Sequence, residues 1–131
     1  MKLPDSLLEN YEVGEKIGAG GMGAIFKAYH RSLDRHAAIK VLSSPVFDEH
    51  DSLIRFEEEA RVCSRMNHPN VVQVFDFDVS TRPAYIVFEL IDGKNLKQLI
   101  KKKTVMPLGH ILDMMTQVFM GLFHAHKQGI I

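Results

Sequence analysis

Hydrophobic and polar residues follow two different periods along this chain. Alternation, or a short apolar run between turn residues, predicts five strands at 11–17, 24–30, 36–42, 71–79 and 84–89. Helical spacing predicts a helix at 48–66, a short one around residues 96–100 and a long one at 108–127. With a short lead-in at 1–10, the order is a three-stranded meander, a helix, two strands, a linker and two helices. This order predicts an α+β fold.

Composition narrows the class of protein. The chain has 131 residues, which predicts one domain with a modest core. Its 16 basic and 16 acidic side chains cancel, so we expect no nucleic-acid surface. The single cysteine, Cys63, excludes an internal disulfide, and no apolar run approaches the ~20 residues of a membrane span. We expect a cytoplasmic protein; the sequence leaves open a membrane anchor further downstream.

A glycine-rich stretch, Gly18–Gly23, is followed seventeen residues later by Lys40. Glycine lets the backbone approach a ligand and present N–H groups to phosphate oxygens. Taken alone, the stretch is equally typical of a tight turn. A dinucleotide-binding fold would need a helix directly after the glycines, but a strand-like alternation follows them. Lys40 lies in a strand that is apolar on both faces, so its charge needs an anionic partner such as a phosphate or a carboxylate.

The predicted helix at 48–66 offers Glu57, Glu58 and Glu59 as carboxylate partners. Successive helical residues point about 100° apart, so at most one of the three faces the sheet. Glu59 lies nearest to the apolar stripe of this helix, whereas Glu58 lies opposite that stripe. We therefore expect Glu59 to pair with Lys40.

Glycine stretch, lysine and glutamate in this order resemble the small lobe of the eukaryotic-type protein kinase family, in the form common among bacterial serine/threonine kinases. Four segments carry further resemblance to that family: Ile17–Gly23, Asn67–Val72, Tyr85–Gly93 and His124–Ile131. The resemblance covers residues 11–131. It implies a small lobe at 11–89 with a five-stranded antiparallel sheet and one helix, a hinge at 90–95, and the first two helices of a large lobe at 96–131.

The resemblance also implies an ATP site. Roles in covering the triphosphate fall to Gly18, Ala19, Gly20, Gly21, Met22 and Gly23. Roles around the adenine and the ribose fall to Ile17, Ile25, Ala38, Phe88 as gatekeeper, the backbone of Glu89 and Ile91, and Gln98. Lys40 and Glu59 would form the ion pair that positions ATP. Ile25 replaces the valine usual in the family and keeps its β-branching.

The groups that would complete catalysis in that family are not among these 131 residues. The catalytic aspartate and the magnesium ligands would follow Ile131, so Mg²⁺ is expected only in the complete protein and this polypeptide alone is expected to transfer no phosphate. Protein substrates would dock on a large lobe. His124 and His126 are interpreted as structural and not as metal ligands.

Two alternatives to a catalytic fragment stay open: a non-catalytic nucleotide-binding module, and a regulatory module that docks on a kinase. The last helix carries apolar residues on more than one side, which predicts self-association through this helix, with the small lobe as a second possible surface.

Overall fold

The computed structural model describes residues 2–20, 23–42 and 50–130. Gly21 and Met22 of the predicted glycine turn lie outside them. Five strands form one antiparallel sheet in the order β1-β2-β3-β5-β4. The strands are β1 (Tyr11–Gly20), β2 (Gly23–His30), β3 (Arg35–Leu42), β4 (Val74–Asp78) and β5 (Tyr85–Glu89). The helices are α1 (Asp5–Asn10), α2 (His50–Ser64), α3 (Leu96–Lys101) and α4 (Leu108–Lys127).

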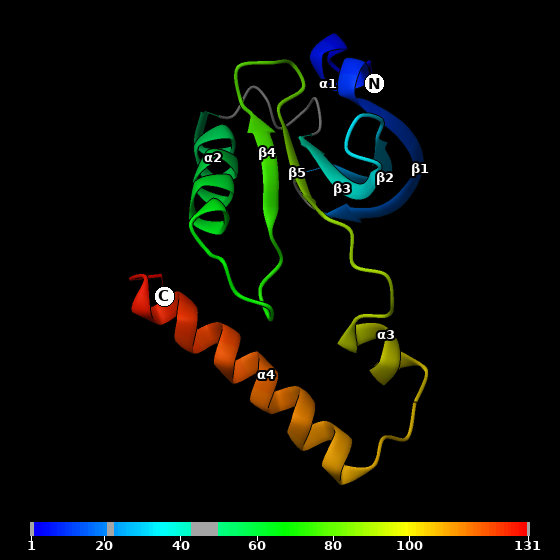
Figure 1. Cartoon of the computed structure of the whole chain (residues 1–131), viewed down its shortest axis with the longest axis vertical. Helices are drawn as coiled ribbons and strands as arrows, with labels where there is room; N and C mark the ends of the chain where they lie inside the picture. Colours follow the sequence, from blue (N-terminus) through cyan, green and yellow to red (C-terminus); the bar gives the residue numbers. More distant parts are fainter. Residues whose placement is uncertain (1, 21–22, 43–49, 131) are drawn as a thin grey trace.

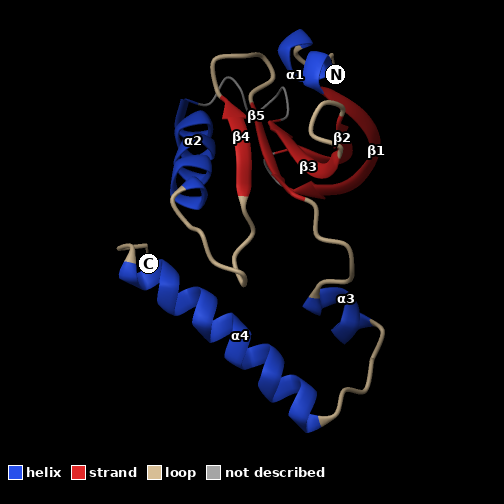
Figure 2. Ribbon diagram, viewed as in Figure 1, coloured by secondary structure: helices blue, strands red, loops and turns tan. Residues whose placement is uncertain are grey.

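The sheet and α2 form the upper part of the molecule, and α3 and α4 lie below it (Figure 1). The extended chain after β5 leads down to α3, and α4 runs back beneath α2 and β4. Figure 2 separates these parts by secondary structure and shows that every strand belongs to the upper part. The predicted five-stranded antiparallel sheet with one accompanying helix is confirmed.

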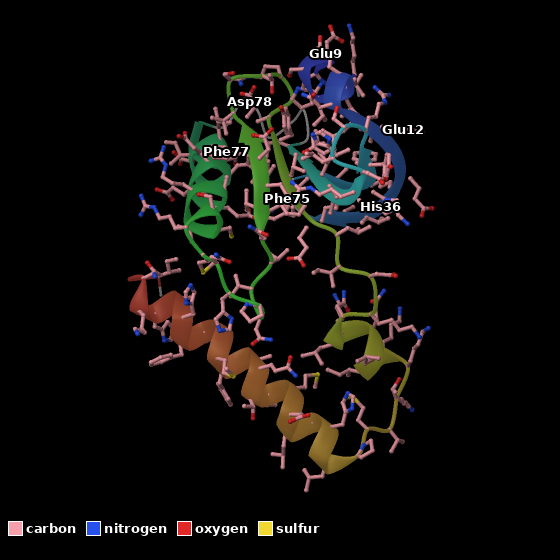
Figure 3. The ribbon with its side chains drawn as sticks, in the orientation of Figure 1. Glu9, Glu12, His36, Phe75, Phe77 and Asp78 are labelled. Atoms are coloured by element: carbon pink, nitrogen blue, oxygen red, sulfur yellow. The ribbon has the colours of Figure 1, made fainter. Side chains whose placement is uncertain are left out.

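Each face of the sheet has its own apolar cluster. The face toward α2 buries Phe56 and Ala60 of that helix against Ile86 and its neighbours. The opposite face buries Ile39 and Val87 together with Leu7 of α1. Strand periodicity explains this division, because consecutive side chains of a strand point to opposite faces. On β4 the alternation is interrupted by a register irregularity between Val74 and Asp76, so that Phe77 lies on the α2 side and Phe75 on the other (Figure 3).

Three segments differ from the sequence-based expectation. The first predicted strand was expected to end at Ile17, but β1 continues through Gly18 to Gly20 because β2 pairs with it as far as Gly20 and Gly23. The predicted lead-in is an integral part of the fold, since α1 buries Leu7 in the core. The strand predicted at 71–79 is shorter and spans β4 only.

Candidate functional site

The register of the sheet places several predicted site residues on one face. In antiparallel pairs, residues directly opposite one another project to the same face. Gly18 pairs with Ile25, and Ile25 pairs with Lys40. Two residues earlier on β3, Ala38 pairs with Phe88 of β5. These five residues therefore share the face that α2 covers, which is the face of the second apolar cluster.

Lys40 and Glu59 meet on this face, as predicted. Lys40 Nζ donates to both carboxylate oxygens of Glu59, at 2.7 Å each. The side chains are 21% and 36% exposed, so the pair is partly screened from water but still reachable from it. The aromatic ring of Phe56 lies beneath the ammonium, with 5.8 Å between Nζ and the ring centroid. Burial of the neighbouring residues on β3 explains the pairing, because a lone charge here would lack a partner.

Cys63 lies one helical turn beyond Glu59, and the charges of the Lys40–Glu59 pair affect the pKa of its thiol. Burial raises the pKa of its thiol, and the negative charge of Glu59 raises it further, whereas the Lys40 ammonium acts in the opposite direction. The thiol is free of any disulfide. At neutral pH, Cys63 is therefore a protonated, weakly nucleophilic side chain beside the pair.

A cleft of about 440 Å³ lies between the β1–β2 hairpin and the chain that follows β5. Three predicted site residues, Ile17, Ile91 and Gln98, line it. Its remaining lining residues are Glu15, Lys27, Leu90, Asp92, Gly93, Lys94 and Asn95. Lys40, Glu59, Ala38 and Phe88 are not part of this lining. The predicted residues thus form two groups. Lys40, Glu59, Ala38 and Phe88 lie between the sheet and α2, whereas Ile17, Ile91 and Gln98 line the cleft beside the linker, called the outer cleft below.

Gln98 has a structural task that the sequence-based interpretation missed. Its side-chain Oε1 accepts from the backbone N–H of Asn95, and its own backbone N–H donates to Asn95 Oδ1, both at 2.9 Å. This reciprocal capping box begins α3. The pattern Asn-x-x-Gln was the signal available in the sequence.

The glycines at the hairpin differ in what their backbones approach. A Cβ built on Gly23 would lie 1.9 Å from the carbonyl oxygen of Val41, so only glycine fits where β2 meets β3. A Cβ on Gly18 would make ordinary contacts with Ile25, the nearest at 3.6 Å. Gly23 is thus required by the sheet itself. Packing does not require a glycine at position 18, so Gly18 stays a candidate for close approach to a ligand.

Glu89 and Ile91 stand where β5 ends and the linker begins. The backbone N–H of Glu89 donates to the carbonyl of Gln73, and its carboxylate accepts from the backbone N–H of Gln73. These contacts fix the end of β5. Ile91 is exposed at the cleft. Gly93, with φ of +149°, then turns the linker through a conformation that other residues rarely adopt.

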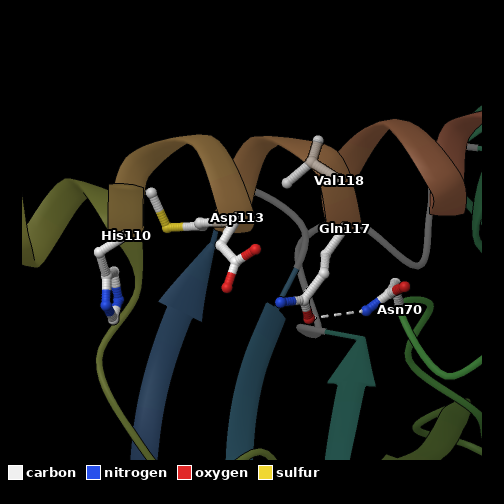
Figure 4. A pocket seen from close by; sticks show the side chains of 6 residues that line it. Asn70, His110, Asp113, Gln117 and Val118 are labelled. Atoms are coloured by element: carbon white, nitrogen blue, oxygen red, sulfur yellow. Dashed lines mark hydrogen bonds between the residues drawn. The ribbon is translucent and has the colours of Figure 1, made fainter. Parts of the chain in front are cut away.

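A second hollow, of about 370 Å³, lies beside α4. His110, Asp113 and Gln117 project from one side of α4 into it, and Asn70 Nδ2 donates to Gln117 Oε1 at 3.1 Å (Figure 4). None of the predicted site residues lies there. Within residues 2–20, 23–42 and 50–130, no group of three or more His, Cys, Asp or Glu could hold a metal ion.

Comparison with known proteins decides the family. A model of the protein kinase domain matches residues 11–131. The chain belongs to the protein kinase family. The matched range begins at the first residue of β1 and so includes the whole sheet, α2, the linker and α4.

Named relatives of this kinase-family chain are bacterial serine/threonine kinases. It is 34% identical to serine/threonine-protein kinase PknA of Mycobacterium tuberculosis, with 96% of this chain and 30% of PknA covered. It is 33% identical to serine/threonine-protein kinase pkn3 of Myxococcus xanthus, with 100% of this chain and 25% of pkn3 covered. The chain therefore spans less than a third of the length of these relatives.

A solved structure shows the same fold. The crystal structure of the Mycobacterium tuberculosis PknI kinase domain superimposes with a TM-score of 0.72 at 28% sequence identity. The match covers 92% of this chain and 49% of the PknI kinase domain. Among the helices described in the kinase-family chain, none is both long and apolar enough to cross a membrane.

Proposed function

We propose that this chain is the ATP-binding part of a serine/threonine protein kinase. The complete protein would transfer the γ-phosphoryl group of ATP to a serine or threonine hydroxyl of a protein. The observation that carries the proposal is the bidentate contact of Lys40 with Glu59, on the sheet face that also holds Gly18 and Ile25. Family membership supports the same function. Residues 11–89 would act as the small lobe and 90–95 as the hinge.

The geometry suits the parts of ATP in turn. Ala38 and Ile25 offer small and apolar surface for the adenine. Phe88 of β5 lies beside them, because it is paired with Ala38. The linker backbone at Glu89 and Ile91 offers hydrogen-bonding groups to the base edge. Lys40 supplies a cation for phosphate oxygens. Glu59 would hold that ammonium in place, because a lysine side chain otherwise has many rotamers to lose on binding.

We propose no Mg²⁺ ligand among the described residues, where no group of three or more His, Cys, Asp or Glu could hold a metal ion. A metal ion would neutralise phosphate charge in the complete protein. We expect this chain to bind ATP. We also propose a cytoplasmic location, where ATP is available and a free thiol is maintained.

Calorimetric titration of the purified chain with ATP tests the nucleotide site. Lys40→Ala should weaken the affinity at least about tenfold, because a hydrogen bond between charged groups is lost. Lys97→Ala is the matched control, since Lys97 is an exposed lysine of α3 outside the cleft. Absence of ATP binding by the unaltered chain, or equal affinity of Lys40→Ala, would refute the site.

A second candidate function is self-association, which is favoured by the exposed apolar side of α4. Leu108, Leu112, Phe119 and Phe123 are between 59% and 71% exposed. With Leu108, Leu112, Met115, Phe119 and Leu122, the helix carries apolar residues at spacings of four and three, which is the seam that paired helices use. The polar side of α4 already faces the hollow at Asn70. We therefore propose that a second copy of this chain covers the apolar side.

A further inference from the structure

Helix α1 lies outside the matched kinase segment and is nevertheless built into the sheet. The matched segment begins at Tyr11, whereas α1 spans Asp5–Asn10 and runs directly into β1 (Figure 1). Leu7 of α1 is only 1% exposed and lies in the same apolar cluster as Tyr11 of β1 and Ala28 of β2, together with residues of β3 and β5. The next residue, Leu8, is 39% exposed. One side of this short helix is therefore part of the core.

Arg31 ties the end of α1 to the end of β2. Its Nη1 donates to the carbonyl oxygen of Leu8 at 3.1 Å and to that of Glu9 at 3.5 Å. Its backbone N–H donates to the carbonyl of Asn10 at 3.1 Å. Carbonyls of the last helical turn lack partners within their own helix, and a cation is favourable at that end. Arg31 thus caps α1 from the first residue after β2.

The same place is the base of the β1–β2 hairpin. Tyr11 and His30 are paired across the two strands, and their rings pack edge to face with centroids 4.6 Å apart. Gly18–Gly20 lie at the other end of β1. An extended strand of this length spans about 30 Å. The anchor and the glycines that are proposed to face the nucleotide are therefore at opposite ends of one strand.

β1 is paired on one side only, and its pairing with β2 is irregular. It is an edge strand, so β2 is its one strand neighbour in the sheet. Their register shifts twice, between Val13 and Lys16 and between Lys16 and Gly18. Interrupted ladders with glycine in the strand open more readily than regular ones. An anchor at the base of the hairpin would limit such opening.

We propose that Leu7 and Arg31 are positioning residues that, through α1, hold the base of the β1–β2 hairpin and thereby the glycine-rich strand ends at the nucleotide. This inference rests on the proposed ATP site for its functional consequence. An anchored hairpin has less freedom to lose when a ligand binds, so affinity should fall when the anchor is removed. Neither residue touches the cleft or the Lys40–Glu59 pair.

The test measures backbone amide exchange and ATP affinity on the full chain. Leu7→Ala should raise exchange in β1 and β2 about tenfold more than in the edge strand β4. It should weaken ATP binding about three- to tenfold. Leu7→Met, which keeps the volume, should restore both values, and Leu8→Ala is the matched control that should change neither. Arg31→Ala should act in the same direction as Leu7→Ala, with Arg31→Lys intermediate.

Each result has a definite meaning. Equal acceleration of exchange in all strands, with ATP affinity unchanged, would show that Leu7 is an ordinary core residue and would overturn the inference. If Leu7→Ala does not fold, Arg31→Ala decides the question by the same two measurements. If the unaltered chain binds no ATP, the proposed function fails by itself, and the exchange pattern still supports or overturns the anchoring of the hairpin.

Discussion

Replacing Gly23 with alanine separates packing from ligand binding at the glycine-rich stretch. A Cβ at this position would lie 1.9 Å from the carbonyl oxygen of Val41 and 2.9 Å from its carbonyl carbon. Real Cβ atoms essentially never come closer than 3.0 Å to a neighbour, so the two backbones must separate by more than about 1 Å. Gly23 pairs with Leu42 at this point, and the movement would break the end of the β2–β3 ladder.

Overpacking of this kind costs about 2 kcal/mol of the free energy of unfolding. For 131 residues, the entropy of unfolding at the midpoint is about 0.28 kcal/mol/K, so Tm should fall by about 7 °C. Thermal unfolding followed by circular dichroism measures this shift. The loss should be present with and without ATP, because its cause lies within the sheet.

Gly18→Ala is the matched variant, since its new methyl group would meet Ile25 at an ordinary 3.6 Å. Its Tm should stay within about 2 °C of the unaltered protein, whereas its ATP affinity should fall if the backbone of Gly18 lies close to phosphate. An unchanged Tm for Gly23→Ala would refute the packing argument. An equal loss of Tm in Gly18→Ala would show that the two glycines do not differ as the geometry requires.

Three further predictions concern the ion pair, the thiol and α4. Glu59→Gln should weaken ATP binding about fivefold in calorimetry, the value of a partly exposed pair, whereas Glu58→Gln on the exposed side of α2 should leave it unchanged. The pH midpoint for alkylation of Cys63 should lie above that of a free cysteine thiol and should move down in Glu59→Gln, because the carboxylate contributes to the raised pKa; an unmoved midpoint would contradict the proposed proximity. Phe119→Glu should abolish self-association in sedimentation measurements while His110→Glu, on the polar side of α4, should not; a monomeric unaltered chain would exclude the proposed pairing.

Local patterns in the sequence were sufficient for most of the elements and for the central ion pair. The long last helix was predicted with the bounds that α4 has, because its apolar spacing persists for twenty residues. Glu59 could be chosen among three neighbouring glutamates from the 100° step of a helix alone. Lys40 could be singled out because the residues beside it in the strand are apolar on both faces. Such inferences depend on residues close together in the chain.

Other features depend on segments that meet only in the folded chain. The requirement for glycine at position 23 comes from Val41, eighteen residues away in the sequence, and so no local pattern could reveal it. The burial of Leu7 depends on a sheet face assembled from four strands, and this made a presumed lead-in part of the core. Gln98 was assigned to the ribose region, and the structure adds a capping role at the start of α3.

By itself, the sequence determined the order of strands and helices, the family, and the lysine and glutamate that form the ion pair, because periodicity and short motifs express local geometry. The tertiary structure decided which residues line the outer cleft, such as Lys27 and Asn95, and how Arg31 joins α1 to the hairpin. These contacts bring together groups from separate elements. Their distances follow from the packing of the sheet against its helices, which no single stretch of sequence specifies.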